Sequence, residues 1–546
     1  MKTPVIKSTS VNQTLTDNIY KPLTINAPFE SLLIDLGLAY DSTKTVTVGV
    51  VKVVSMGTWI TNGAAVPTEL TNEEGCDTAV RITLKEGSHF EEGEMYQITV
   101  TYTIKGSSIT NTQVGYLAMN YMLNDNIIVD ALNGERKMVV CISDIHMGQD
   151  DIYTEFRENR KPLIDFLNKL NSSSSVSELV IAGDLFDEWI IPASKDADGI
   201  PRENCSCFAE KVKQNNEDVF TALNKVCDNE AITTTYVPGN HDLMIDKDQV
   251  SKVLPNIKQA RDITGIIPGV GLGSYSPKDF PFAIIEHGHR YNFFCAPCMI
   301  VENDPDEQSI LPPGYFLTRV ATEAFCFRLK NGKQKLPTTE MQYGDENRFM
   351  RSQYSASCLS SLQILPVNYS PSDKFIKANI GGFNDIYSLN DLMPHLENGE
   401  LVSKLYKTIS DNENWENRQA ANNVLVKIPA LEGILESNSG QETDSMSNVQ
   451  YFANPESDKT IVVFGHSHEP RIVTYPTTGY PTGIYANTGT WIDNNLTGMT
   501  TMTFVVLIAN KTKESVPAFV NLYQYTPEGK VVLMDSQATF NFTENK

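Results

Sequence analysis

The chain has 546 residues, of which 67 are acidic and 44 basic, so its formal net charge is -23. With 41% hydrophobic and 20% charged residues it has the composition of a soluble globular protein, and its length predicts two to four structural units of ~150 residues each. So acidic a chain is short of the Lys and Arg patches that bind phosphate backbones, which argues against nucleic acid or an anionic membrane as a partner. The nine cysteines are scattered, which favours free thiols with at most one local disulfide.

Residues 1–130 are predicted to form an N-terminal immunoglobulin-like β-sandwich. Three stretches rich in β-branched residues, Thr45–Val54, Ala79–Leu84 and Tyr96–Ile104, are separated by turn-like segments. No group of ligand-type side chains occurs here, so we assign this unit no chemistry. The first residues lack the apolar core of a signal peptide, and no run of ~18 apolar residues occurs anywhere in the chain. We therefore expect a cytoplasmic protein without a membrane span.

A different pattern begins at residue 137. Met138–Ile142 is an apolar run typical of a buried strand, and it ends at Ser143. Asp144 and His146 follow with one residue between them, so alternation along the chain places both side chains on one face. One anionic oxygen and one imidazole at the end of a rigid strand are suitable ligands for a divalent cation.

The same pattern of apolar run and polar cluster returns four times. The later clusters contain Asp184 in ELVIAGDLFDE; Asn240, His241 and Asp242 in TTTYVPGNHD; His287 and His289 in FAIIEHGH; and His466 and His468 in TIVVFGHSHEP. Six of the eight histidines fall within these clusters. Because ligands of open α/β sheets bind outside the carboxyl ends of the strands, we expect the five clusters to meet at one site.

Between the clusters the apolar spacing predicts helices over Asp151–Leu170 and Asp218–Val226. This β-α-β order predicts an α/β fold with a mostly parallel sheet. Three apolar segments after Trp491 are predicted to be antiparallel strands that complete a second sheet; they are 501–510, 518–526 and 530–537.

About 170 residues separate His289 from the last cluster, which is far too long for a simple loop. We therefore predict an inserted cap or subdomain at 291–459, with a helix-like stretch at Asn390–Thr408. Because this segment starts and ends beside candidate ligands, it is expected to shape access to the site. No motif inside it identifies a substrate.

The ordered elements SDIHMG, GDLFDE, GNHD, HGH and GHSHEP resemble the calcineurin-like metallophosphoesterases, whose pattern is D-x-H, G-D-x-x-D, G-N-H-[DE], H and G-H-x-H. The resemblance covers roughly 137–290 and 460–495, where YANTGTW is also similar to a closing strand of that family. It implies an α/β fold with an αββα sandwich core, here within a domain at 131–546.

The resemblance also implies two divalent metal ions. One would be held by Asp144, His146 and His468, the other by Asn240, His287 and His466, and Asp184 would bridge them. Mixed nitrogen and oxygen ligands suit Mn, Fe or Zn, and the sequence does not choose among these metals. A hydroxide bridging the two ions would be the nucleophile that attacks phosphorus.

Further roles follow from the same resemblance. His241 would be the general acid, the alternative being a hydrogen-bonded structural histidine. Asp242 would be the carboxylate that orients an imidazole, with Asp187 in a similar supporting place. His289 is expected to be a neighbour or a substrate contact rather than a ligand. Arg290 is a weaker candidate for contact with substrate phosphate.

The leading hypothesis is a metal-dependent enzyme that hydrolyses a phosphate ester, as a phosphomonoesterase or a phosphodiesterase. The substrate could be a small molecule, a nucleotide or a phosphoprotein, and the oligomeric state is not predicted. The alternative is a non-catalytic, metal-stabilised binding or scaffold protein. A zinc metalloprotease is disfavoured because no H-E-x-x-H motif occurs.

Overall fold

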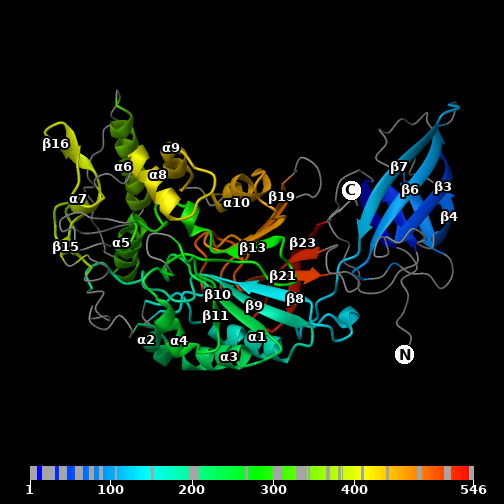
Figure 1. The fold of residues 1–546 in the computed structure, drawn as a ribbon, viewed down its shortest axis with the longest axis horizontal. Helices are drawn as coiled ribbons and strands as arrows, with labels where there is room; N and C mark the ends of the chain where they lie inside the picture. The colour runs from blue at the N-terminus through cyan, green and yellow to red at the C-terminus, as the bar shows by residue number, and fades with distance from the viewer. Residues whose placement is uncertain are drawn as a thin grey trace.

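The computed structural model is described over part of the chain, and the account below is limited to that part. The described residues are 9–14, 31–35, 46–55, 66–72, 79–84, 90, 92–104, 107–148, 153–195, 208–264, 269–298, 310–327, 341, 343, 345–363, 369–378, 383, 385–406, 411–437, 442–475, 483–509 and 518–539. Figure 1 shows an N-terminal sheet in blue, a mixed α/β core, and a group of helices on the other side of that core.

The N-terminal sheet has seven strands in the order β1-β2-β5-β4-β3-β6-β7. Their bounds are β1 Thr9–Thr14, β2 Ser31–Asp35, β3 Val46–Ser55, β4 Val66–Asn72, β5 Ala79–Leu84, β6 Met95–Ile104 and β7 Thr110–Ala118. The three strands predicted here are confirmed as β3, β5 and β6. The immunoglobulin-like sandwich and the domain boundary at residue 130 stay predictions.

A short buried connection joins β7 to the core. The side-chain amides of Asn120 and Asn521 exchange two hydrogen bonds of 3.0 Å, and Tyr121 packs edge-on against Phe519. The 3-10 helix η2 (Asp130–Leu132) follows and leads directly into the first core strand.

The first core sheet has seven strands in the order β11-β10-β9-β8-β21-β22-β23. Its parallel half contains β8 Met138–Ile142, β9 Val176–Ala182, β10 Thr233–Val237 and β11 Lys258–Gln259, and its antiparallel half contains β21 Thr503–Ala509, β22 Ala518–Tyr525 and β23 Val531–Thr539. The three C-terminal strands are thus where the sequence predicted them, but their placement in a second sheet is wrong. β21 pairs with β8 and so extends the first sheet, and its side chains point alternately to the two faces of that sheet. Val505 and Leu507 face the second sheet, whereas Phe504 and Val506 face the helices.

The second sheet has five strands in the order β12-β13-β18-β20-β19. Their bounds are β12 Ser274–Tyr275, β13 Ala283–Glu286, β18 Ile461–Phe464, β20 Gly483–Asn487 and β19 Arg471–Tyr475. The two sheets meet face to face through buried aliphatic side chains such as Val139, Val180, Ile285 and Val463. This pair of facing mixed sheets forms the α/β core that the sequence predicted.

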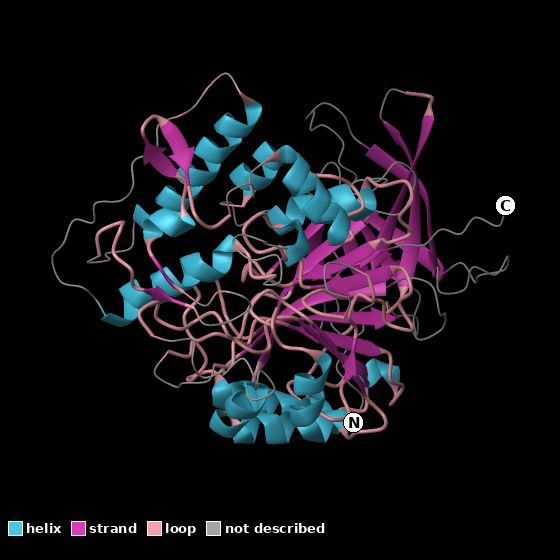
Figure 2. Ribbon diagram, turned by 60° about the vertical axis from the view of Figure 1, so that its left-hand side comes forward, coloured by secondary structure: helices cyan, strands magenta, loops and turns pink. Residues whose placement is uncertain are grey.

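Helices cover the outer faces of the two sheets (Figure 2). Beside the first sheet lie α1 Arg160–Ser172, α2 Phe208–Asn215, α3 Glu217–Cys227 and α4 Lys247–Val253; beside the second lie α10 Glu442–Ser447 and the π-helix η5 Asn448–Phe452. The prediction of α3 is confirmed. α1 starts at Arg160 rather than at residue 151, because the carboxylate of Asp493 accepts the N–H groups of Arg157 and Asn159 and holds the preceding turn against another loop.

The segment 291–459 is inserted between β13 and β18, which are neighbouring parallel strands. It contains α5 Pro313–Phe327, α6 Glu346–Gln363, β14 Ile376–Lys377, β15 Ile386–Tyr387, α7 Leu389–Leu392, β16 His395–Glu397, β17 Glu400–Val402, α8 Asn412–Ala421 and α9 Ala430–Glu436, besides α10 and η5. The single helix predicted over Asn390–Thr408 is wrong. α7 ends before Pro394, and Asn398 and Gly399 have φ of 52° and 84°, which closes the β16–β17 hairpin instead.

Candidate metal centre

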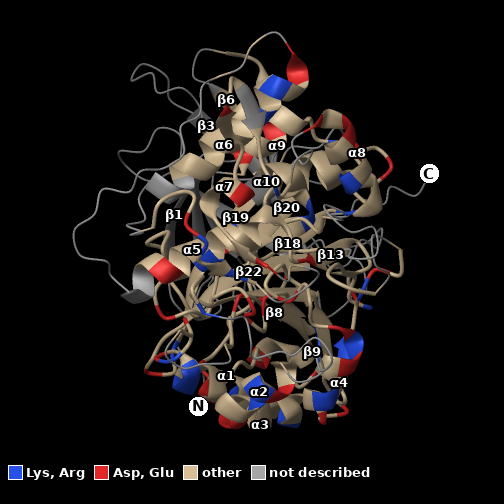
Figure 3. Cartoon of the chain, turned by 90° about the vertical axis from the view of Figure 1, so that its left-hand side faces the viewer, with Lys and Arg blue, Asp and Glu red and all other residues tan. Residues whose placement is uncertain are grey.

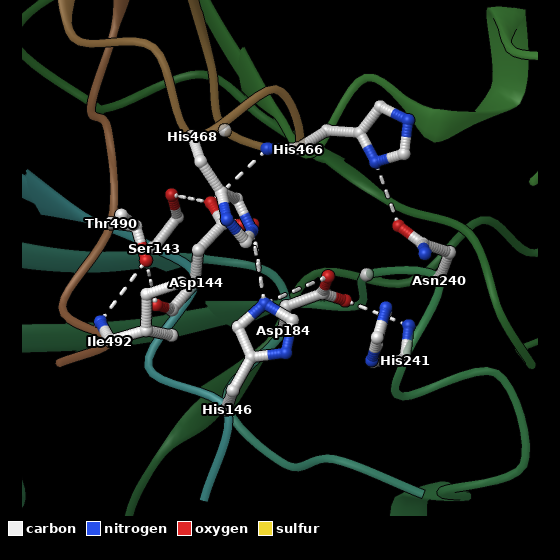
Figure 4. Close-up of polar contacts among 12 residues, drawn as sticks. Ser143, Asp144, His146, Asp184, Asn240, His241, His466, His468, Thr490 and Ile492 are labelled. Atoms are coloured by element: carbon white, nitrogen blue, oxygen red, sulfur yellow. Dashed lines mark hydrogen bonds and ion pairs between the residues drawn. The ribbon is translucent and has the colours of Figure 1, made fainter. Parts of the chain in front are cut away.

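The loops that follow β8, β9, β10, β13 and β18 meet at one edge of the core (Figure 4). They bring together the side chains of all seven residues proposed as ligands: Asp144, His146, Asp184, Asn240, His287, His466 and His468. All except the two histidines of the last cluster are buried. The expected meeting of five strand ends is therefore present in the structure.

One half of the cluster contains Asp144, His146 and His468. Oδ1 of Asp144 lies 3.1 Å from Nε2 of His468 and 3.7 Å from Nε2 of His146. These two imidazole nitrogens face each other at 3.1 Å. Oδ2 of Asp144 accepts from the Ser143 hydroxyl and from the His466 N–H, whereas the buried Oδ1 has no hydrogen-bond donor among the described residues. An unsatisfied carboxylate oxygen beside two facing imidazoles fits a cation.

The other half contains Asn240, His287 and His466. The side-chain oxygen of Asn240 lies 3.0 Å from Nε2 of His287 and 2.8 Å from Nδ1 of His466. Nδ1 of His287 contacts the carbonyl oxygen of Ala182 at 2.8 Å, so in the neutral ring Nε2 is the nitrogen that can bind a metal.

Asp184 lies between the two halves. Its Oδ2 is 3.2 Å from Nε2 of His287 and 3.6 Å from Nε2 of His146, and its Oδ1 accepts the N–H of His241 at 2.8 Å. The sets Asp144–His146–His468 and Asp144–Asp184–His287 each have ligand atoms close enough to hold a metal ion. The carboxylate of Asp184 can therefore contact both halves.

The backbone at these residues is in an uncommon conformation. Eleven non-glycine residues in the described part of the chain have positive φ, and five of them are proposed ligands: Asp144 (53°), His146 (52°), Asp184 (50°), His466 (69°) and His468 (58°). Each such residue costs about 1 kcal/mol or more and persists only where its surroundings enforce it. The fold thus holds strained backbone where the candidate ligands converge.

Two glycines are required by close approach to these ligands. A Cβ at position 239 would overlap the carboxylate of Asp184, and one at position 183 would overlap the His287 ring. Gly183 also has φ of 91°, which a side chain would disfavour. Both positions admit only glycine because ligand side chains occupy the space beside them.

The carboxylates and imidazoles perturb one another. Burial would raise the pKa of Asp144, but the imidazoles of His468 and His287 hold it well below its usual value. Burial would lower the pKa of His287, but the charges of Asp184 and Asp144 raise it to about 9. Burial and the charge on His287 lower the pKa of His466 to about 3. The carboxylate charge is thus balanced by protons on some imidazoles, and cations can replace those protons.

Asp187 contacts the two histidines beside the cluster. Its Oδ1 lies 2.8 Å from Nδ1 of His241, and its Oδ2 lies 3.3 Å from Nδ1 of His146. The orienting role was expected mainly of Asp242, and this needs correction. Asp242 accepts backbone N–H groups instead, from Phe186 at 2.8 Å and from Leu185 and Gly239 at 3.2 Å. It shapes the loop after β9, and Asp187 orients the imidazoles.

Two further candidates belong to the scaffold. Arg290 is buried, and its guanidinium forms ion pairs of 2.7 Å with Glu286 and 3.0 Å with Asp262. His289 is also buried and is the first residue of the 3-10 helix η4 (His289–Tyr291). Its Nε2 lies 2.8 Å from the carbonyl oxygen of Gly271. Its ring lies beside that of His287, with centroids 5.3 Å apart, and its not being a ligand stays a prediction.

The end of β20 and the residues after it also hold the site, although the sequence analysis assigned them no individual role. The Thr490 hydroxyl and the Trp491 N–H donate to the carbonyl oxygen of Asp144 at 2.8 and 3.0 Å. The side chain of Asn487 donates to the carbonyl oxygen of Gly465 at 2.7 Å. The available signal was a run of polar residues directly after a buried strand.

The fold and the site together define a class of protein: a mixed α/β protein with an Asp/His cluster suited to metal ions at its strand ends. Residues 137–303 match the model of the calcineurin-like phosphoesterases, so the chain carries a domain of that family there. No curated protein matches the chain significantly. His466 and His468 lie beyond the matched residues, yet they complete the cluster.

No helix in the described ranges is long and apolar enough to cross a membrane.

Proposed function

We propose that the chain is an enzyme that uses two divalent metal ions to hydrolyse a phosphate ester. The family of the matched domain suggests metal-dependent hydrolysis of phosphate esters, and the Asp/His groups could hold metal ions. The observation that carries the proposal is the left-handed backbone at five converging ligand residues. Such strain is typical of functional sites.

Each proposed metal has its own set of side chains. Asp144, His146 and His468 would hold one, and Asn240, His287 and His466 the other, with Asp184 shared. Bound there, Mn, Fe or Zn ions would act as Lewis acids toward the phosphate and make a water acidic enough to attack phosphorus near neutral pH.

In this proposal His241 would deliver a proton to the leaving oxygen. Its side chain is 12% exposed, whereas that of His146 is 1% exposed, so it can meet a bound ester. Asp187 holds its Nδ1, which leaves Nε2 as the atom that would give a proton to the substrate.

The surface charge limits the substrate. The outer helices α2, α3 and α4 carry both acidic and basic residues (Figure 3), and the chain as a whole is strongly acidic. Attraction of a phosphate group would therefore come mainly from the metal ions. A small phosphate ester, a nucleotide or a phosphoprotein segment suits this site better than a long nucleic acid.

The test is a metal and activity measurement on the purified chain. The protein is stripped of metal, loaded with Mn(II), Fe(II) or Zn(II), and assayed with 4-nitrophenyl phosphate and bis(4-nitrophenyl) phosphate. We expect about two ions per chain and turnover of at least one ester. Bound metal without hydrolysis of any ester in a broad panel would instead favour the non-catalytic binding protein.

A further inference from the structure

Trp189 lies against the proposed general acid. Its indole, 1% exposed, stacks on the imidazole of His241 with ring centroids 4.6 Å apart and planes inclined by 24°. Its backbone N–H donates to Oδ1 of Asp187 at 2.9 Å, the same oxygen that contacts Nδ1 of His241. On another side the ring of His146 meets His241 edge-on at 4.5 Å. The imidazole is therefore restrained by a flat face, a carboxylate and a neighbouring ring.

The inserted segment also contacts this indole. The ring of Tyr315 in α5 lies edge-on to Trp189 at 6.0 Å and is fully buried. The first turn of α5 approaches so closely that a Cβ at Gly314 would lie 3.3 Å from Cζ3 of Trp189. Trp189 is thus packed between α5 and His241.

Arg319 of α5 ties the residues after Trp189 to the insertion. Its buried guanidinium donates to the carbonyl oxygens of Ile191 (3.3 Å), Pro192 (3.0 Å) and Lys195 (2.6 Å), and also to that of Lys377. One turn further along α5, Glu323 accepts the N–H and hydroxyl of Ser194 at 2.9 and 2.8 Å. The loop that carries Trp189 therefore cannot move independently of α5.

We propose that Trp189 is a positioning residue that holds the imidazole of His241 in place, and that α5 secures Trp189 through Tyr315 and Arg319. This inference rests on the proposed function, and it gives the long insertion a role in catalysis. Displacement of the general acid should slow hydrolysis most for esters whose leaving group is a weak acid, because these leaving groups depend most on protonation.

The test compares two substrates in matched variants. Phenyl phosphate releases phenol, whose pKa is about 10, whereas 4-nitrophenyl phosphate releases a much stronger acid. Trp189→Ala should lower kcat about 100-fold on phenyl phosphate and about 10-fold or less on 4-nitrophenyl phosphate. Trp189→Phe should restore most of the loss, since it keeps a ring and the indole N–H has no hydrogen-bond partner among the described residues.

The chain offers a control for each variant. Trp415 is equally buried, at 1% exposure, and donates to the carbonyl oxygen of Ile428 at 2.8 Å in another part of the insertion. Trp415→Ala should therefore leave the ratio of the two rates unchanged. Arg319→Met should shift that ratio in the same direction as Trp189→Ala, whereas Arg418→Met should not, because Arg418 donates to Ala296 and Pro297.

The outcomes separate this inference from the proposed function. Equal loss on both substrates in Trp189→Ala would mean a merely structural role and would overturn the inference. If the unchanged protein hydrolyses neither substrate, the proposed function fails for such esters, and a crystal structure of Trp189→Ala decides the inference instead. A shifted or multiply ordered His241 ring supports it, and a ring unchanged against Asp187 overturns it.

Discussion

The strand-end loops and the inserted segment use charge in opposite ways. At the strand ends, buried carboxylates face imidazoles over distances of 2.8 to 4.0 Å, and one carboxylate oxygen of Asp144 has no hydrogen-bond donor among the described residues. In the insertion, the buried arginines Arg319 and Arg418 donate to backbone carbonyl oxygens. The carboxylates and imidazoles at the strand ends are suited to bind cations, whereas the arginines of the insertion hold loops in place. The following changes would break or sharpen this contrast.

Asp184→Asn should have the largest effect. Two cations repel each other, and the shared carboxylate that offsets this repulsion would be lost. We expect loss of one bound ion per chain and a fall in kcat/KM of about 1,000-fold, roughly 4 kcal/mol. Elemental analysis and an ester assay measure both.

Glu178→Gln is its control, because Glu178 is a buried carboxylate at the other end of the same strand, where it accepts from the Tyr275 hydroxyl at 2.6 Å. This control should keep both ions. Retention of both ions in Asp184→Asn would contradict a bridging role.

His241→Ala should come next. Removal of a general acid lowers kcat by about 100- to 1,000-fold and leaves the proposed metal ligands intact, so the metal content should not change. His395→Ala is the control, since His395 lies in the β16–β17 hairpin of the insertion, with its Nδ1 3.2 Å from the carbonyl oxygen of Met393. Equal kcat values in the two variants would exclude the proposed acid.

Metal affinity should depend on pH in a defined direction. The pKa of His287 is about 9 without metal, because the charges of Asp184 and Asp144 outweigh burial, and its proton must leave when a cation binds. Affinity should therefore rise about tenfold per pH unit between pH 6 and 9 and level off above that. Competition titrations with a chelator measure this, and affinity that falls with rising pH would argue against His287 as a ligand.

The smallest effect on activity is expected in the insertion. Gly399→Ala introduces a side chain at φ of 84° in the β16–β17 hairpin, where space is free within 4 Å. It should reduce the free energy of unfolding by about 1 kcal/mol and leave kcat/KM unchanged. Thermal denaturation together with the ester assay checks this. A large loss of activity would show that the hairpin also shapes the site.

The sequence allowed the strand ends to be predicted because each motif is short and local. Asp144 and His146 directly follow one apolar run, and Asp184 follows another, so their convergence needed only the general rule for α/β sheets. The ligands separated by the insertion were found in the same way. His466 and His468 follow β18, which pairs with β13 although some 170 residues lie between them.

Other features could not be predicted because they depend on contacts between distant segments. Both Asp187 and Asp242 follow a strand closely, and only the fold shows that the first faces imidazoles while the second accepts backbone N–H groups. The stacking of Trp189 on His241 requires α5, which lies more than 120 residues further along the chain. The start of α1 likewise depends on two hydrogen bonds to the distant Asp493. The β16–β17 hairpin does not, because Asn398 and Gly399 at its turn are a local signal that the helix prediction overlooked.

The central claim is that Asp184 is shared by two metal ions, and anomalous diffraction from crystals grown with Mn(II) tests it most directly. We predict two peaks ~3.5 to 4 Å apart, both in contact with the Asp184 carboxylate. One peak should also contact His146 and His468, and the other His287 and Asn240. A single peak, or two peaks that do not share Asp184, would contradict the claim.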